Sequence, residues 1–226
     1  PFKTVRCTRP PSASAELRAL DILLHYTRQT MEAGRFSSEF PADGQEYFFD
    51  IAVEDAQSAL EEAFQTSSPR HKRNAVRAVF AFIDGCHNFV RSHVNSQASA
   101  YKHLYSLSDL AVLREESPYV DERGNVKTRQ LKVPLITSIK ALLKLLEKNN
   151  VAKHEVDLTH SGFFALAKAI EIRNRVVHPK NAKELDLSEN DMQLVAQAFN
   201  WYLAFALRIS YASNEALETL INSFKK

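Results

Sequence analysis

Three polar side chains near the end of one predicted helix have the types and the spacing that phosphodiester chemistry needs. Arg173, Asn174 and His178 lie within a few residues of one another, and Pro179 follows them directly. At about 100° per residue, Asn174 and His178 fall on one face of a helix, with Arg173 beside them. Arginine offers a planar fork of donors for phosphate oxygens, and histidine gains or loses a proton near neutral pH. These residues therefore could bind a phosphodiester and transfer a proton to it.

The element that must position these side chains is a helix predicted over 163–177. Its apolar residues recur at helical spacing, namely Phe163, Leu166, Ala167, Ile170 and Val177. Because a residue before proline is pushed out of the helical region, we expect His178 to lie partly exposed at the helix end, where free carbonyls and the helix dipole favour its charged form. An arginine and a histidine at such an end are also common as a simple cap on a solvated face, without any chemistry.

The same residues resemble the signature of the HEPN superfamily (higher eukaryotes and prokaryotes nucleotide-binding domains). In that signature Arg-Asn, a short interval and His-Pro close an apolar helix, and the matching residues here are Arg173, Asn174, His178 and Pro179. The resemblance extends over about 69–226 and implies an all-α, up-down helical bundle. Many members are metal-independent endoribonucleases that act as dimers, often in toxin–antitoxin or antiviral systems, whereas others are inactive binding modules.

The resemblance favours RNA cleavage as the function. The ribose 2′-OH would attack the adjacent phosphate, His178 would transfer a proton, Arg173 would stabilise charge on the phosphoryl oxygens, and Asn174 would orient His178 or the phosphate. One arginine and one histidine are few for this task, so we expect a homodimer in which a second copy completes the site. No cofactor is expected. The alternatives are a non-catalytic dimeric binding module for a nucleotide or a partner protein, and a toxin neutralised by an antitoxin.

Residues that support the motif are expected on a second helix, predicted over 69–95. Asp84 and Asn88 form an i, i+4 pair on it, and HEPN-like domains often place a polar residue on this helix. We expect Asp84 or Asn88 to face the motif helix and orient its side chains; the alternative is a buried polar pair whose members satisfy one another. A metal site of Asp84, His87 and His93 is disfavoured, because the chain has no tight array of ligands with suitable spacing.

Basic residues in two places are candidates for contacts with RNA phosphates. Arg175 and Lys180 flank the motif, and a cluster at the start of the 69–95 helix contains Arg70, Lys72, Arg73 and Arg77. A run of charges at a helix end is more often just a solvated face. Arg73-Asn74 repeats the Arg-Asn step but lacks a histidine at the required distance, so we expect no chemistry there.

Composition excludes several other classes of protein. The chain of 226 residues is 45% hydrophobic, which is enough for a real core, and has only five glycines and no phosphate-binding glycine loop. A net charge of +2 means that any contact with RNA must be local. Two cysteines, Cys7 and Cys86, are too few for a disulfide framework. No apolar run approaches the ~18 residues of a membrane span, so we expect a soluble cytoplasmic protein with no membrane partner.

Helical periodicity covers most of the chain, and we expect a single all-α domain over 1–226, with N-terminal helices (1–68) packed on a HEPN-like core (69–226). The exception is a loop or hairpin inserted near 117–133, where Asp121–Asn125 reads as a turn between two short extended arms. The other predictions concern helix positions: helices over about 14–34, 45–65 and 134–148, turns over 37–44, a broken helix over 96–116, Thr159 or Ser161 as the cap of the motif helix, Ser188 with Asp191 as the cap of the last helix, and a division of that helix at Ser213-Asn214.

Overall fold

The computed structural model describes residues 45–100, 105–148 and 158–224. The predicted helix over 14–34 and the turns over 37–44 lie outside these residues. The chain divides into two compact units, 1–50 and 51–226, and of the first only the opening turns of one helix are described. All described residues after Asp50 belong to the second unit.

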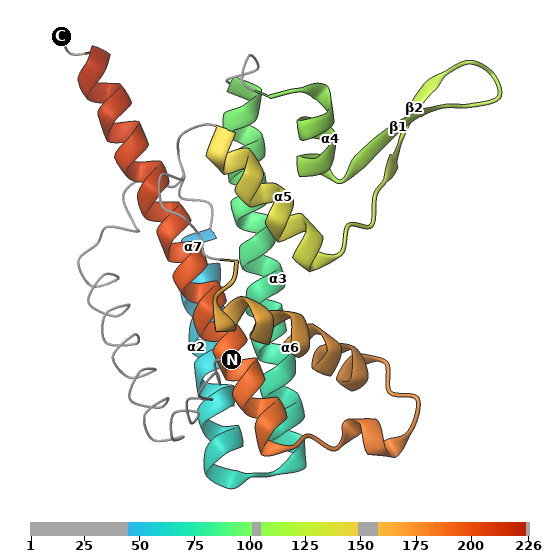
Figure 1. Ribbon diagram of the computed structural model, residues 1–226, viewed down its shortest axis with the longest axis vertical. Coiled ribbons are helices and arrows are strands. Elements are labelled where there is room, and N and C mark those ends of the chain that lie inside the picture. The colour runs from blue at the N-terminus through green and yellow to red at the C-terminus, as the bar shows by residue number, and fades with distance from the viewer. Residues whose placement is uncertain (1–44, 101–104, 149–157, 225–226) are drawn as a thin grey trace, which may run out of the picture. The chain divides into compact units, whose positions relative to one another are not determined.

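Helices dominate the described chain, which confirms a mostly helical fold of the all-α class (Figure 1). A single two-stranded antiparallel sheet is the exception among the described residues. The elements, in chain order, are α2 (Gln45–Thr66), α3 (Pro69–Ala100), α4 (Leu107–Arg114), β1 (Glu116–Val120), β2 (Val126–Gln130), α5 (Leu135–Lys148), α6 (Ser161–Val177), the 3-10 helix η1 (Ala182–Leu185) and α7 (Glu189–Phe224).

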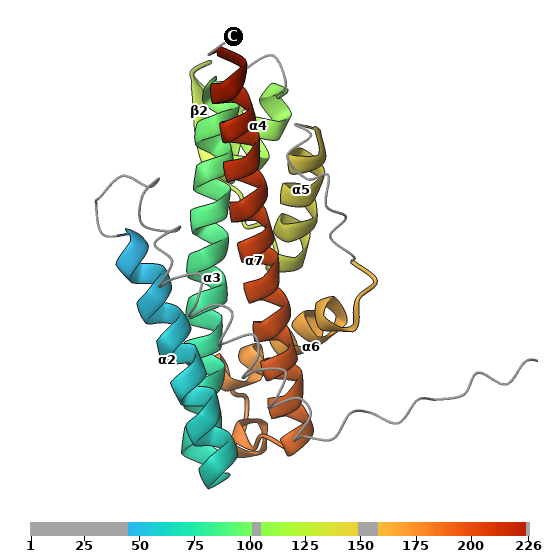
Figure 2. The same cartoon turned by 90° about the vertical axis from the view of Figure 1, so that its left-hand side faces the viewer.

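The long helices α3 and α7 lie side by side, as both views show (Figures 1 and 2). Their shared core is aromatic: the ring of Phe82 on α3 meets Phe199 on α7 edge-on, with 5.1 Å between centroids. The motif helix α6 packs against both α7 and α3. Gly162 in its first turn allows a very close approach, because a Cβ at this position would lie 2.6 Å from the Cβ of Trp201. Burial of these apolar faces is the main force that holds α6 in place.

The predicted hairpin is confirmed, with strands longer than expected. β1 pairs with β2 in a regular antiparallel register from Glu116 opposite Gln130 to Val120 opposite Val126. The turn forms because the carboxylate of Asp121 accepts hydrogen bonds from the backbone N–H groups of Arg123 and Asn125, and Gly124 takes the positive φ of 79° that favours glycine. The hairpin extends away from the helices (Figure 1).

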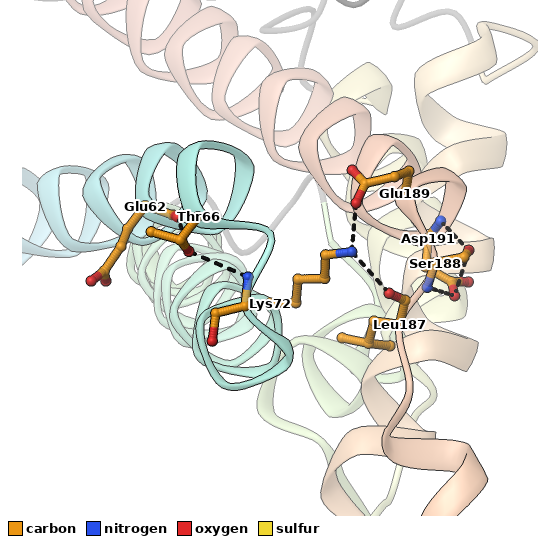
Figure 3. Close-up of polar contacts among 8 residues, drawn as sticks. Glu62, Thr66, Lys72, Leu187, Ser188, Glu189 and Asp191 are labelled. Atoms are coloured by element: carbon orange, nitrogen blue, oxygen red, sulfur yellow. Dashed lines mark hydrogen bonds and ion pairs between the residues drawn. The ribbon is translucent and has the colours of Figure 1, made fainter.

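Two predictions about helix ends need correction, and a third is confirmed. The residue that caps the start of α6 is His160, not Thr159 or Ser161, because the Nδ1 atom of His160 accepts from the N–H of Gly162. α7 continues through the predicted division at Ser213-Asn214, since serine and asparagine cost a helix only tenths of a kcal/mol, ~0.5 each. Ser188 and Asp191 form the expected reciprocal cap at the start of α7 (Figure 3).

No described helix combines the length and the apolar character that a membrane span requires.

Candidate functional site

The motif lies at the end of α6, where the prediction placed it. α6 ends at Val177, and His178 leaves the helical region as the C-terminal cap while its backbone N–H donates to the carbonyl of Asn174, 2.9 Å away. The next residue, Pro179, explains this end, because its ring disfavours a helical conformation at His178. Both Asn174 and His178 are exposed. The expectation of an exposed histidine at the helix end is therefore confirmed.

Arg173 is held by two groups of α3. Its Nη2 atom lies 3.0 Å from Oδ2 of Asp84, and its guanidinium lies over the ring of Phe80, with 5.7 Å to the centroid. An ion pair and a cation–π contact on one guanidinium restrict its orientation. A contact of this kind was expected from either Asp84 or Asn88, and the structure shows it for Asp84. Arg173 nevertheless remains partly exposed, at 39% of its side chain, and its free donors can meet a ligand.

Two opposing effects act on the carboxyl group of Asp84. Burial raises its pKa above the usual value, and the positive charge of Arg173 acts in the other direction. Protonation of Asp84 would remove the charge that holds the guanidinium. The position of Arg173 is therefore sensitive to acid.

The other two motif side chains have no such anchor. Within 45–100, 105–148 and 158–224, neither the amide of Asn174 nor the ring of His178 forms a hydrogen bond, and both are exposed. An exposed imidazole without a hydrogen-bond partner among these residues is open to an incoming ligand. The motif therefore combines one oriented cation with two freely accessible polar groups.

The exposed face of α6 that carries Asn174 is partly apolar. Phe164 is 63% exposed and Val177 is 45% exposed. At about 100° per residue, Phe164 lies about 80° to one side of Asn174 and Val177 about 60° to the other, with Ala167 and Ile170 between them. Phe163, which also falls between them at the start of α6, is instead buried against Trp201. The two side chains lie about 20 Å apart along the helix axis, and contact with another molecule would remove both from water.

Lys72 does not fit its predicted role as a phosphate ligand. It is only 8% exposed, and its Nζ atom donates to the carbonyl of Leu187 at 3.2 Å and to Oε1 of Glu189 at 2.6 Å (Figure 3). A buried ammonium with these partners is a fixed part of the fold. It ties the start of α3 to the start of α7, a contact between residues more than a hundred positions apart that no local pattern reveals.

Two other predicted phosphate ligands, Arg73 and Arg175, form contacts with residues between α6 and the first turn of α7. Arg73 is half-buried and reaches the carbonyl of Leu185, with 3.5 Å between Nη1 and O. Arg175 donates from Nη2 to Oδ1 of Asp191 at 2.8 Å and so links the end of α6 to the start of α7. Each side chain positions the segment that follows the motif. Lys180, in contrast, has an exposed side chain.

Arg70 and Arg77 remain as the exposed cations of the basic cluster. Their positions, with Arg73, repeat at intervals of three and four residues, so they share one face of α3. The same face continues to Asp84, seven residues beyond Arg77 or about 10 Å along the axis. A row of arginines on α3 therefore leads to the ion pair that holds the motif.

Asn88 does not support the motif by contact. It is exposed, and its Oδ1 atom accepts from Nη2 of Arg91 at 3.0 Å rather than from a group on α6. The alternative, a buried pair of Asp84 and Asn88, is also wrong, because the two side chains have different partners. Of the two candidate supporting residues, Asp84 is the one in contact with the motif.

His87 belongs to a buried polar cluster whose other members, Ser138 and Tyr202, the sequence analysis did not identify. Its Nε2 atom is 2.8 Å from Oγ of Ser138 on α5, and its Nδ1 atom is 3.2 Å from the hydroxyl of Tyr202 on α7. Burial lowers the pKa of His87 to about 4; the charge of Arg91 acts in the same direction and that of Glu115 opposes it. The ring is therefore neutral at pH 7 and joins three helices. The sequence feature that could have indicated this cluster is the position of His87, a polar residue among the buried apolar residues of α3.

These contacts disfavour the metal interpretation of this part of α3. Both ring nitrogens of His87 and the carboxylate of Asp84 have other partners. Among the residues the structure describes, no group of three or more His, Cys, Asp or Glu side chains is arranged to hold an ion. The side chain of His93 lies outside those residues. Burial also raises the pKa of the Cys86 thiol to about 12, so this cysteine is unreactive.

Comparisons with protein-family models, with curated proteins and with solved structures find no match for this chain.

Proposed function

We propose that the protein is a metal-independent endoribonuclease of the HEPN type, with Arg173, Asn174 and His178 as its catalytic residues. The observation that carries the proposal is the arrangement at the end of α6. One guanidinium is oriented by Asp84 and Phe80 from α3, and the exposed residues Asn174 and His178 follow Arg173 within five positions at the same end of α6. A phosphate bound there would meet both a cation and a group that transfers protons.

The proposed reaction is attack within the RNA strand. One histidine takes the proton of the ribose 2′-OH, and the oxygen then attacks the adjacent phosphorus. The bond from phosphorus to the 5′ oxygen of the next nucleotide breaks, and that oxygen leaves with a proton from a second acid. The products are a 2′,3′-cyclic phosphate and a 5′-hydroxyl. Arg173 stabilises the negative charge that develops on the phosphoryl oxygens, and Asn174 orients His178 or the phosphate.

The second acid is the reason for proposing a homodimer. A single chain supplies one motif histidine, and a two-fold axis beside α6 would bring a second His178 and Arg173 to the same phosphate. The exposed apolar side chains of α6, Phe164 and Val177, are suited to such a contact because their burial is favourable. Asn174 lies between these two side chains around α6, so an interface on this face would bring Asn174 and His178 of the two copies together, and a groove between the copies would admit a single strand.

The exposed arginines of α3 are proposed to guide the RNA to the motif. Arg70 and Arg77 lie on the face that leads to Asp84, and Lys180 lies just beyond the motif. Each contact with a phosphate releases counterions, so these residues would affect binding in a salt-dependent way. Lys72 is not part of this path, because it is buried.

The reaction is tested with one RNA oligonucleotide and its fully 2′-O-methylated form, each incubated with the purified protein in excess chelator. We expect cleavage of the RNA alone and recovery of 2′,3′-cyclic phosphate ends, since the methyl group removes the attacking nucleophile. Cleavage of the methylated strand, or ends with a 3′-hydroxyl, would contradict the mechanism. Binding of RNA without cleavage would instead favour a non-catalytic module.

A further inference from the structure

The two edges of the β1–β2 hairpin are not equivalent. In an antiparallel pair, residues whose N–H and C=O groups point to the partner strand alternate with residues whose groups point outward. At one end the N–H of Leu131 donates to the carbonyl of Glu115, and at the other the N–H of Asp121 donates to the carbonyl of Asn125. Because the register is regular between these bonds, the odd-numbered strand residues face inward. The even-numbered residues point their backbone groups to solvent.

Proline closes one of these edges. On β1 the central outward position is Pro118, which has no N–H to donate to a further strand. The opposite edge has no such block. On β2 the outward positions are Val126, Thr128 and Gln130, all exposed, and each presents both a donor and an acceptor. Only β2 can therefore extend the sheet without losing a central hydrogen bond.

The side chains of β2 define what kind of strand could pair there. Lys127 and Arg129 project from one face, and Val126 projects from the other, next to Val120 across the hairpin. The two valines are 75% and 65% exposed. Lys127 pairs with Asp121 at 2.8 Å, whereas Arg129 forms no ion pair within the described part of the chain. An incoming strand would meet positive charge on one face and apolar surface on the other.

A second copy of β2 does not fit this edge. Antiparallel pairing centred on Thr128 would place Lys127 directly opposite Arg129 of the other copy. Arg129 would likewise lie opposite Lys127 of the other copy. Like charges directly opposite one another destabilise a sheet. Shifts of the register by two residues still set cation against cation. The charges of β2 thus disfavour pairing between copies.

We propose that the outer edge of β2 is a docking site for an extended peptide of a partner protein in which acidic and apolar residues alternate. The peptide adds a third, antiparallel strand through the outward backbone groups of Val126, Thr128 and Gln130. Its acidic side chains lie opposite Lys127 and Arg129, and its apolar side chains cover the valine face. A hairpin alone is marginally stable in water, so a third strand also stabilises the β1–β2 hairpin.

The probe for this site is a short fluorescent peptide of alternating glutamate and valine, compared by anisotropy with the same peptide carrying lysine in place of glutamate. With the full chain we expect the acidic peptide to bind more tightly than the basic one. Thr128→Pro removes a donor from the outer edge but none from the hairpin itself, and should weaken binding roughly tenfold. Thr128→Val, which keeps the N–H, is the matched control and should bind like the wild type.

Hydrogen exchange at the inward amides of Lys127 and Arg129 reports whether Thr128→Pro keeps the hairpin. The double variant Lys127→Glu with Arg129→Glu tests the charge preference without relying on Thr128→Pro. We expect this variant to bind the basic peptide more tightly than the acidic one. Equal affinity for both peptides, failure of the charge reversal to invert the preference, or wild-type binding by a folded Thr128→Pro variant would overturn the proposal. The proposal would also be overturned if the hairpin bound single-stranded RNA but not the acidic peptide, and if Tyr119→Ala abolished that RNA binding.

Discussion

The guanidinium of Arg173 lies 3.0 Å from the carboxylate of Asp84, and this ion pair joins two helices across 89 positions of sequence. Together with the contact of Arg173 over Phe80, it sets the direction of the guanidinium at the exposed end of the motif. Asp84 is therefore a positioning residue in the proposed mechanism. It acts through Arg173 and does not itself touch the phosphate.

Replacement of Asp84 by asparagine should slow RNA cleavage about tenfold, because one charge-assisted hydrogen bond to Arg173 is lost. Asp84→Glu keeps the charge and should recover part of the rate, which a merely structural role in packing would not predict. Asn88→Ala, one turn further along α3, is the matched control and should cleave like the wild type. A wild-type rate for Asp84→Asn in single-turnover assays would show that Arg173 needs no support.

The protein should lose stability between about pH 6.5 and pH 4 because of His87. Burial lowers the pKa of His87 to about 4 in the folded state, whereas an unfolded chain has the ordinary value near 6.5. In this window the unfolded state binds more protons, so the free energy of unfolding falls as the pH falls, on the order of 3 kcal/mol in all.

Urea unfolding of the wild type and of His87→Gln at a series of pH values measures this contribution. The glutamine keeps polar contacts to Ser138 and Tyr202 but cannot titrate, so its curve should be flatter through the window. Parallel curves for the two proteins would refute the assignment to His87, since the other titrating groups are common to both.

Substitution of Gly162 by alanine should destabilise the protein by about 1–3 kcal/mol. The new Cβ would lie 2.6 Å from the Cβ of Trp201, an atom close to the α7 backbone that cannot rotate away. Thermal unfolding of Gly162→Ala, with Ser161→Ala at the exposed neighbouring position as the control, tests this close approach. The control should unfold near the wild-type temperature; a Gly162→Ala variant that matched it would mean that α6 shifts without cost.

Local sequence patterns were enough to predict the parts of the fold that depend on residues close together in the chain. The end of α6 follows from Pro179, and the hairpin follows from the residues of its turn, because both are set within a few positions of chain. The exposed position of His178 follows for the same reason. These features needed no knowledge of the tertiary structure.

Features that depend on distant residues were missed or misjudged. A lysine at the start of a helix normally points to solvent, but Lys72 is buried by Leu187 and Glu189 of another element. His87 was considered only as a metal ligand, since Ser138 and Tyr202 lie on other helices. The resemblance predicted a contact from Asp84 or Asn88 to the motif helix, and helical spacing alone could not choose between the two or exclude a buried pair.

The protein should form a homodimer through the exposed face of α6. Phe164→Glu places a charge at the proposed contact and should give a folded monomer by light scattering, with loss of RNA cleavage. Leu107→Glu introduces the same change at another exposed position, on α4, and should leave both dimer and activity intact. A wild type that is monomeric at micromolar concentration and still active would contradict the shared site.

RNA cleavage in excess chelator by the wild type and by His178→Ala tests the proposed catalytic role of His178. The exposed His178 forms no side-chain hydrogen bond or ion pair within the described residues, so the variant should fold normally while its rate falls by roughly 10²–10⁴. His71→Ala, at a histidine far along the chain that bonds to Thr66, controls for loss of an imidazole and should retain activity. Equal cleavage by the wild type and by His178→Ala would show that His178 is not a catalytic residue.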